Sequence, residues 1–362
     1  MDGSRDLAGI REALIRDRAM AGVASELVLE GMGRVEAAVG DCEDMMLEAM
    51  RLFALAGNGH TRLIPNAAAK VYPLRLVWSG QGLWSCPEAR RVVSVNGVCV
   101  EELHDRLGDY LAGTSARRRV IGGLPLVWSP ALERLGVAKR GEPVTYRFTK
   151  GRNVTVRETD RIRALVHYPV GEQGYPTPGR DPYRPRQGVL RLDSFSSDPV
   201  SVASRLQRAD EMLERHKGPL VVDLRGNPGG DFIRHLPILD RIEAFGRPVT
   251  VLVDRFTFSA AIVFAALCRA RLEARVVGEE MGDGLQFHAE GDTLTLPECG
   301  AAVRHSDAWH DWETGRATLG TPPVIAKQMR ACGRLTPEPR IVTTPDDLAA
   351  GKDPALDAAQ AA

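Results

Sequence analysis

The second half of the chain alternates short apolar strands with helical segments, and this alternation limits the fold more than any other feature. The apolar runs read "GVLRLDSF", "PLVVDL", "PVTVLVD" and "ARVVGE". Segments with apolar residues at helical spacing lie between these runs. The first such segment has Asp198 as its expected N-cap and Pro199 at its first helical position. Buried strands that alternate with helices pair in parallel, because each helical crossover returns the chain in the same direction. The sequence therefore predicts an α/β layer built on a parallel sheet.

The first half of the chain has a different pattern. The whole chain, at 362 residues, is too long to form a single core. Apolar residues recur at helical spacing up to about residue 56, with Asp41 as a cap. Short apolar runs bounded by Gly and Pro follow, including a hairpin signal at Asn96-Gly97. We predict four segments: a helical unit (1–66), a β-rich module (67–170), a linker dense in Gly, Pro and Arg (171–187) and the α/β core (188–362).

Charge and hydropathy exclude several classes of partner. Lys+Arg and Asp+Glu both number 47, without a block of like charge, so the chain lacks the basic surface typical of proteins that bind nucleic acid or anionic membranes. It has no run of about 18 apolar residues, and its N-terminus lacks the apolar core of a signal peptide. The prediction is a cytoplasmic protein, or a periplasmic one if this N-terminus is that of a processed form. Homo-oligomerisation is left open.

Cysteines and histidines do not indicate a metal centre. The six cysteines are scattered without a C-x-x-C pair, which predicts reduced thiols rather than disulfides or a zinc site. "HSDAWHDW" places His305, Asp307 and His310 close together, but this is not a metal-binding spacing. We predict neither metal nor cofactor.

Two strand ends of the core carry groups that could act chemically. In parallel sheets such groups gather at the carboxyl ends of the strands. "RGNPGGD" follows one strand and could cradle a phosphate, form an oxyanion hole or be a plain turn; the P-loop and dinucleotide patterns are absent. Ser259 follows the next strand and is either a helix N-cap or a nucleophile at a helix N-terminus.

A serine nucleophile requires a base, because its hydroxyl is weakly nucleophilic at neutral pH. No lysine lies between Ser259 and Lys327. Of the eight histidines, His60 in the glycine-flanked corner "AGNGHT" is the best candidate; its alternative is a solvated loop residue.

Eight segments, taken in order, resemble one family from about residue 45 to the end of the chain. They are "LAGNGHT", "VVSVNGVCVEEL", "GVLRLDSF", "PLVVDLRGNPGG", "VLVDRFTFSAA", "ARVVGEEMGDG", "LTLPECG" and the tail from "PEPRIVTTPDD" onward. Together they resemble the C-terminal-processing (tail-specific) and tricorn-core serine peptidases. The resemblance implies an α/β, crotonase-like (ClpP/crotonase) core with an N-terminal helical unit and a degenerate PDZ-like module.

The resemblance also implies residue roles. Ser259 matches the nucleophile, the amides of Gly229 or Gly230 and of Ala260 match the oxyanion hole, and His60 matches the base of the tricorn-like branch. Gly284 stands where the tail-specific branch has its lysine, which predicts a Ser–His rather than a Ser–Lys mechanism.

Two departures concern the group that orients the histidine. Gly59 precedes His60 where the tricorn-like branch has Ser, and the distal Glu of that branch has no clear counterpart. Glu279, Glu280 and Asp307 are the candidates for an orienting acid.

The predicted function is hydrolysis of an unstructured peptide or protein tail through an acyl-enzyme on Ser259. Because backbone amides would hold the oxyanion, a β-branched residue at Gly230 is expected to abolish turnover and to leave folding largely intact. The alternatives are a catalytically inactive homologue that binds a peptide or another ligand, and a crotonase-type enzyme that binds acyl-CoA.

Overall fold

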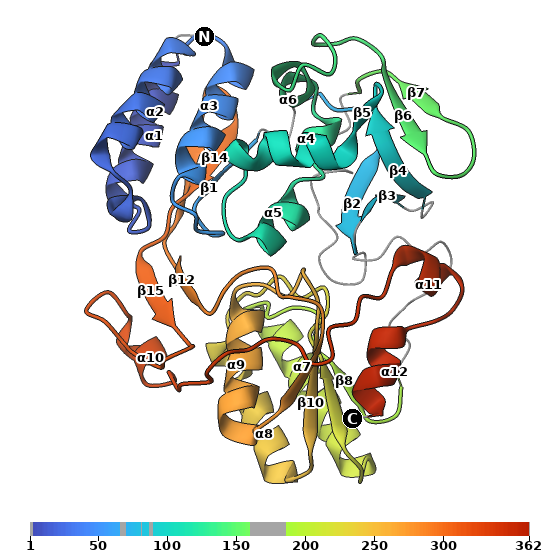
Figure 1. The fold of residues 1–362 in the computed structure, drawn as a ribbon. Helices are drawn as coiled ribbons and strands as arrows, with labels where there is room; N and C mark the ends of the chain where they lie inside the picture. Colours follow the sequence, from blue (N-terminus) through green and yellow to red (C-terminus); the bar gives the residue numbers. More distant parts are fainter. Residues whose placement is uncertain (1–2, 66–69, 81, 87–89, 160–185, 362) are drawn as a thin grey trace. The chain divides into compact units, whose positions relative to one another are not determined.

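The structure, a computed structural model, describes residues 3–65, 70–80, 82–86, 90–159 and 186–361 (Figure 1). The chain divides into two compact units: unit 1 is Met1–Tyr168 with Phe287–Trp309, and unit 2 is Pro169–Gln286 with His310–Ala362. The segment 287–309 thus groups with the N-terminal part of the chain. Of the predicted linker, residues 171–185 lie outside the described residues. Within the described ranges, no helix is long and apolar enough to cross a membrane.

Unit 1 begins with the predicted helices, α1 (Ser4–Arg16), α2 (Ser25–Ala37) and α3 (Cys42–Ala54). Asp41 caps α3, since its side chain accepts from the N–H groups of Glu43 and Asp44. The buried faces of these helices form one apolar core with a three-stranded sheet, ordered β1-β14-β13, whose strands are Arg62–Ile64, Ala301–Arg304 and Thr293–Leu296.

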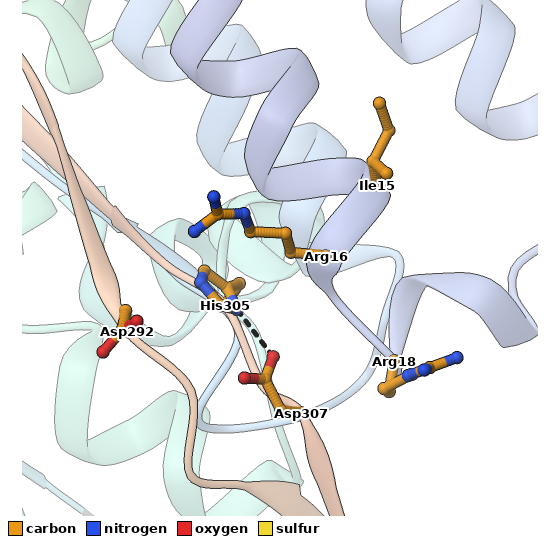
Figure 2. A pocket seen from close by; sticks show the side chains of 6 residues that line it. All are labelled: Ile15, Arg16, Arg18, Asp292, His305 and Asp307. Carbon is orange, nitrogen blue, oxygen red and sulfur yellow. Dashed lines mark hydrogen bonds and ion pairs between the residues drawn. The ribbon is translucent and has the colours of Figure 1, made fainter.

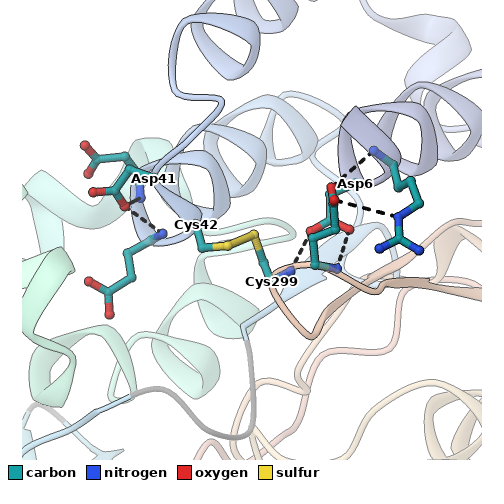
Figure 3. The surroundings of a disulfide bond; sticks show 8 residues. Asp6, Asp41, Cys42 and Cys299 are labelled. Atoms are coloured by element: carbon teal, nitrogen blue, oxygen red, sulfur yellow. Dashed lines mark hydrogen bonds and ion pairs between the residues drawn. A yellow bond between two sulfur atoms is a disulfide. The ribbon is translucent and has the colours of Figure 1, made fainter. Parts of the chain in front are cut away.

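A disulfide joins a helix of unit 1 to this sheet, which corrects one prediction. Cys42, the first residue of α3, is bonded to Cys299 between β13 and β14, with 5.3 Å between the two Cα atoms (Figure 3). The Asp6 carboxylate accepts from the Cys299 N–H (2.7 Å) beside it. The prediction of reduced thiols is therefore wrong for this pair. The two cysteines lie 257 residues apart in the sequence, so their spacing carries no signal and only the packing brings them together.

The β-rich part of unit 1 contains a second sheet, ordered β2-β3-β4-β6-β7 with β5 paired to β4. Asn96 and Gly97 form the predicted two-residue turn, with φ of 46° and 87°, and Val95 pairs with Val98 across it. The strands are Arg75–Ser79, Gly82–Cys86, Arg90–Val95, Val98–Cys99, Val144–Phe148 and Val154–Val156 for β2 to β7, and the helices are α4 (Val100–Arg106), α5 (Ser115–Ile121) and α6 (Ser129–Arg134). This sheet has its own apolar core around the fully buried Trp78 and Tyr146.

Unit 2 contains the predicted parallel sheet. Its strands, β8 (Val189–Arg191), β9 (Leu220–Asp223), β10 (Val249–Val253) and β11 (Arg275–Gly278), pair in parallel in the order β11-β10-β9-β8. The helices are α7 (Pro199–Arg215), α8 (Leu236–Phe245), α9 (Ala260–Leu272), α10 (Pro323–Ala326), α11 (Pro345–Ala349) and α12 (Pro354–Gln360). Asp198 caps α7 as predicted.

Two helices pack on the parallel sheet of unit 2. Helix α9 is buried from Ala260 to Cys268, and it packs against β10 and β11. Helix α12 contributes Ala355, Leu356 and Ala359 to a cluster with Val221, Leu252 and Val277 of the sheet. A further pair of strands, β12 (Gln286–Ala289) and β15 (Ala308–Asp311), lies where the chain passes between the units.

Candidate active site

The glycine turn that follows β9 is held in shape by Asn227. Its Nδ2 donates to the Leu192 carbonyl (2.9 Å), its Oδ1 accepts from the Gly229 N–H (2.9 Å), and the residue is fully buried. The Gly229 carbonyl accepts from the Phe195 N–H (3.0 Å), which joins the turn to the segment after β8. Displacing the buried side-chain amide of Asn227 would cost free energy, because the Leu192 carbonyl and the Gly229 N–H would each lose a hydrogen-bond partner. The turn is therefore a fixed piece of backbone.

Gly230 leaves no room for a side chain. Its φ is 129°, which side chains disfavour, and a Cβ built on it would lie 2.0 Å from the Phe195 carbonyl oxygen. The expectation that a β-branched residue here would leave folding largely intact is therefore wrong. The backbone at Phe195 would have to move to admit even one carbon atom, so a substitution at Gly230 disturbs structure and chemistry together.

One carboxylate oxygen organises the turn between β10 and α9. Oδ1 of Asp254 accepts from the N–H groups of Gly226 (3.0 Å), Phe256 (2.9 Å) and Thr257 (3.0 Å), and Asp254 is 1% exposed. Hydrogen bonds to an ionised acceptor are stronger than those between neutral groups. Because Gly226 belongs to the glycine turn and Thr257 lies two residues before Ser259, this carboxylate joins the two strand-end turns.

Ser259 has an unusual backbone conformation, with φ of 55° and ψ of −125°. Such a conformation costs a residue with a side chain about 1–3 kcal/mol. Ser259 holds the N-cap position of α9, yet its side chain makes no capping hydrogen bond within the described part of the chain. A Cβ built on Gly229 would lie 2.7 Å from the Ser259 Cβ and 2.9 Å from the Ala260 nitrogen. The fold thus brings Gly229, Ser259 and Ala260 together.

Two backbone N–H groups beside Ser259 are open. Neither the Gly230 N–H nor the Ala260 N–H donates to an acceptor among the residues that the structure describes. Gly230 bridges in parallel to Phe195, but the bonds of that bridge use the neighbouring Gly229 and Asp231. Ala260 is the first residue of α9, where the helix dipole favours negative charge. Open donors at a helix N-terminus can stabilise an oxyanion.

An ionic cluster lies at the end of β9, directly before the glycine turn. The Arg225 guanidinium contacts Asp223 (Nη2–Oδ2, 2.9 Å) and Asp353 (Nη1–Oδ1, 2.8 Å), and Arg191 also contacts Asp223 (3.0 Å). Both Asp223 and Arg225 are 2% exposed. Burial by itself would raise the pKa of Asp223, but the charges of Arg225 and Arg191 lower that pKa to about 2. Because Asp353 precedes α12, the cluster ties the C-terminal helix to the sheet.

This shift predicts a loss of stability in acid. The folded pKa of Asp223 lies below its ordinary value of 3.8, so the ionised group stabilises the fold above that value. The contribution, about 2 kcal/mol at 1.36 kcal/mol per pKa unit, is lost as the pH falls from about 4 to about 2. Chemical denaturation of the parent and of Asp223→Asn across this range measures it. An equally steep loss in the variant would contradict the assignment.

Two of the three candidate orienting acids lie in unit 2 and have other partners there. Glu279 accepts from Nε of Arg255 (2.7 Å), and both residues are buried. Burial raises the pKa of Glu279, while the charge of Arg255 opposes that rise. Glu280 lies at the surface, 3.7 Å from Nη2 of Arg340. The role of either carboxylate toward His60 stays a prediction.

The corner that carries His60 is built in unit 1 by a buried polar network. Asp17 accepts from the Thr61 hydroxyl (2.6 Å) and the Ser306 N–H (2.9 Å), and Asn58 Nδ2 donates to the Thr61 hydroxyl (3.0 Å). The ring of His60, itself 2% exposed, stacks on Phe287 with centroids 5.2 Å apart. The residues on both sides of His60 are thus anchored, which gives the ring a defined place within unit 1.

The third candidate acid, Asp307, lies in unit 1 beside His305. Its Oδ1 is 2.8 Å from Nδ1 of His305, and both residues line a hollow of about 520 Å³ together with Arg16, Arg18 and Asp292 (Figure 2). His310, the other histidine of this motif, belongs to unit 2, where its Nδ1 accepts from the Trp312 indole (3.2 Å). No group of three or more His, Cys, Asp or Glu in the described ranges could hold a metal ion.

The predicted site residues thus fall into two sets. Gly229, Gly230, Ser259 and Ala260 belong to unit 2, whereas His60 and Asp307 belong to unit 1. Sequence reasoning did not single out Asp254 or Asn227, which hold the two turns. A signal for Asp254 was present, because it is a carboxylate at the end of the buried run "PVTVLVD", where a charge requires partners.

In sequence, the chain matches no protein-family model and no curated protein. Among solved structures it is similar to mature CPAF, with a TM-score of 0.64 and 11% identity over 98% of this chain and 95% of that chain. For mature CPAF in complex with lactacystin these values are 0.63, 11%, 96% and 95%. For a serine-to-alanine mutant of CPAF they are 0.61, 10%, 96% and 94%. The chain has the fold of mature CPAF.

Proposed function

We propose that this protein is a serine peptidase that acts through an acyl-enzyme on Ser259 with His60 as general base. The observation that carries the proposal is the geometry of Ser259. It is held in a strained backbone conformation at the N-terminus of α9, does not cap that helix within the described residues, and lies beside two open backbone donors. The ordered sequence resemblance to the tail-specific and tricorn-core peptidases and the fold shared with CPAF support it.

In the proposed reaction, Oγ of Ser259 attacks the carbonyl carbon of the scissile peptide bond and His60 takes the hydroxyl proton. The negative oxygen is held by the N–H groups of Gly230 and Ala260. Gly230 is preferred over Gly229 because the Gly229 N–H already donates to Asn227. The amine leaves with the proton from His60, and water then hydrolyses the ester with the same base. His60 belongs to unit 1 and Ser259 to unit 2, and their joint action is part of this proposal.

The proposed substrate is an unstructured peptide or protein tail. We assign the β-rich part of unit 1 to the PDZ-like module that the resemblance implies, as part of this proposal. PDZ-like modules bind extended peptides as an added strand. The crotonase-like assignment of the parallel sheet and the Ser–His rather than Ser–Lys chemistry belong to the same proposal.

The test is covalent labelling with a fluorophosphonate, followed by mapping of the adduct by mass spectrometry. We expect the label on Ser259 and a strong loss of labelling in His60→Ala. A label on another residue contradicts the assignment of the nucleophile. A chain that takes no label and hydrolyses no peptide or p-nitrophenyl ester is instead the non-catalytic binding homologue.

Asp254 provides a prediction about positioning. Asp254→Ala removes the carboxylate oxygen that accepts from three backbone N–H groups, of which only Thr257 also donates to the Asp254 carbonyl. We therefore expect the Ser259 turn to shift and kcat to fall by about 10²-fold, the cost of a misplacement of about 1 Å. Asp254→Asn keeps an acceptor oxygen and should recover most of the activity. Steady-state kinetics on both variants checks this. An asparagine variant as impaired as the alanine variant would show that the charge, rather than the hydrogen bonding, is needed.

A further inference from the structure

Two arginines of unit 1 lie opposite each other near the His60 corner. Arg62 of β1 pairs directly with Arg304 of β14 in the antiparallel sheet, so both side chains leave the same face. The Cβ atoms of such partners are about 4.5–5.5 Å apart. The neighbouring pair, Leu63 and Val303, enters the apolar core on the other face. The arginine face is therefore the one that the helical core does not cover.

Helix α5 brings a third arginine, Arg117, close to this pair. A Cβ built on Gly113 would lie 2.8 Å from Cγ of Arg117 and 3.0 Å from Cα of Gly59. The Gly59 carbonyl in turn accepts from Nη1 of Arg62 (2.8 Å). Burial, together with the charges of Arg117 and Arg304, lowers the pKa of Arg62 to about 9. The three guanidinium groups are close enough to repel one another.

Two members of this cluster lack a counter-charge. No carboxylate in the described ranges forms an ion pair with Arg62 or Arg304, and Nε of Arg304 is buried and donates to no described acceptor. Like charges directly opposite each other destabilise a sheet, and a buried donor without an acceptor costs free energy. A bound anion would remove both penalties.

We propose that Arg62, Arg117 and Arg304 bind a carboxylate group of the peptide substrate, an inference that rests on the proposed peptidase function. A guanidinium binds a carboxylate through two parallel N–H bonds. Thr293 pairs with Arg304 from the third strand and places a hydroxyl on the same face. Arg62 lies two residues after His60, so the site would select peptides by a carboxylate held near the proposed base. That carboxylate is either the C-terminus of the peptide or an acidic side chain.

The test uses the full chain with Ser259→Ala, so that peptides bind without being cleaved. Three fluorescein-labelled pools of randomised octapeptides are compared by fluorescence anisotropy: one without Asp or Glu and with a free C-terminus, the same pool amidated, and the amidated pool with one central Glu. We expect at least one carboxylate pool to bind tenfold or more tightly than the neutral pool. The pool that binds identifies the source of the carboxylate.

Arg304→Gln should remove this preference, and Arg11→Gln, a change at an exposed arginine of α1, should leave it intact. Equal binding of all pools, no binding, or an unchanged preference in Arg304→Gln overturns the inference. The inference is also overturned if inorganic phosphate stabilises the protein against unfolding and no carboxylate pool does. Fluorophosphonate labelling of the parent protein is measured separately. If Ser259 is labelled but no peptide pool is preferred, only the carboxylate site is contradicted. If a carboxylate pool is preferred but Ser259 is not labelled, only the peptidase proposal is contradicted.

A stability measurement separates a binding role from a structural one. If the cluster exists to bind an anion, Arg304→Gln relieves repulsion in the unliganded protein, and its unfolding midpoint should rise by about 2 °C. If Arg304 serves only to hold the fold, the midpoint should fall. Scanning calorimetry of parent, Arg304→Gln and Arg304→Lys at low salt gives the sign, and a fall in Arg304→Gln contradicts the proposal.

Discussion

Replacing Ser259 with alanine is expected to lower kcat for peptide hydrolysis by on the order of 10⁵- to 10⁶-fold, because the nucleophile and the base of a serine peptidase act as a unit. Oγ of Ser259 is the atom that would bond to the substrate carbon, and the open amides of Gly230 and Ala260 cannot replace it. Folding should be unchanged, since this side chain caps nothing among the described residues. Kinetics with a casein or ester substrate and circular dichroism measure the two effects.

The matched control is Ser197→Ala, a change at an exposed serine of the same unit, which should keep full activity and full labelling. His60→Ala should lose nearly as much activity as Ser259→Ala, and the double variant should lose no more than the worse single variant. Additive losses would show that the two residues do not act in one mechanism. Unchanged hydrolysis in Ser259→Ala would remove the proposed function altogether.

Replacing Arg225 with methionine is expected to lower the free energy of unfolding by about 3–5 kcal/mol. Methionine fills a similar volume, but it leaves Asp223 and Asp353 buried without the guanidinium that both contact. Breaking one partner out of a buried ion pair is far more costly than the net value of the pair, because the remaining charge is desolvated. Urea denaturation measures the loss.

The exposed Arg234 offers a control for this change, since its pair with Asp231 is solvated. Arg234→Met should alter the free energy of unfolding by less than about 1 kcal/mol. A comparable effect of the two substitutions would mean that the cluster at the end of β9 is not what holds the C-terminal helix.

Some elements of the fold could be predicted because their signals are local. Alternating apolar strands and helices indicated the parallel sheet of unit 2, Asp41 and Asp198 marked helix starts, and Asn96-Gly97 marked a hairpin. The Cys42–Cys299 disulfide could not be predicted, because its partners meet only after α3 packs on the sheet. The same holds for Gly230, whose need for a bare Cα arises from the approach of Phe195.

By itself, the sequence determined which residues stand at the ends of the strands and at the glycine-flanked corner, since chemical type and spacing along the chain suffice for that. Only the tertiary structure decided how they are held: Asp254 joining two turns, Asn227 occupying the Gly229 N–H, and Arg62 facing Arg304. These contacts join segments up to 242 positions apart, as in the Arg62–Arg304 pair. Their geometry depends on how strands are ordered and paired, which no local pattern encodes.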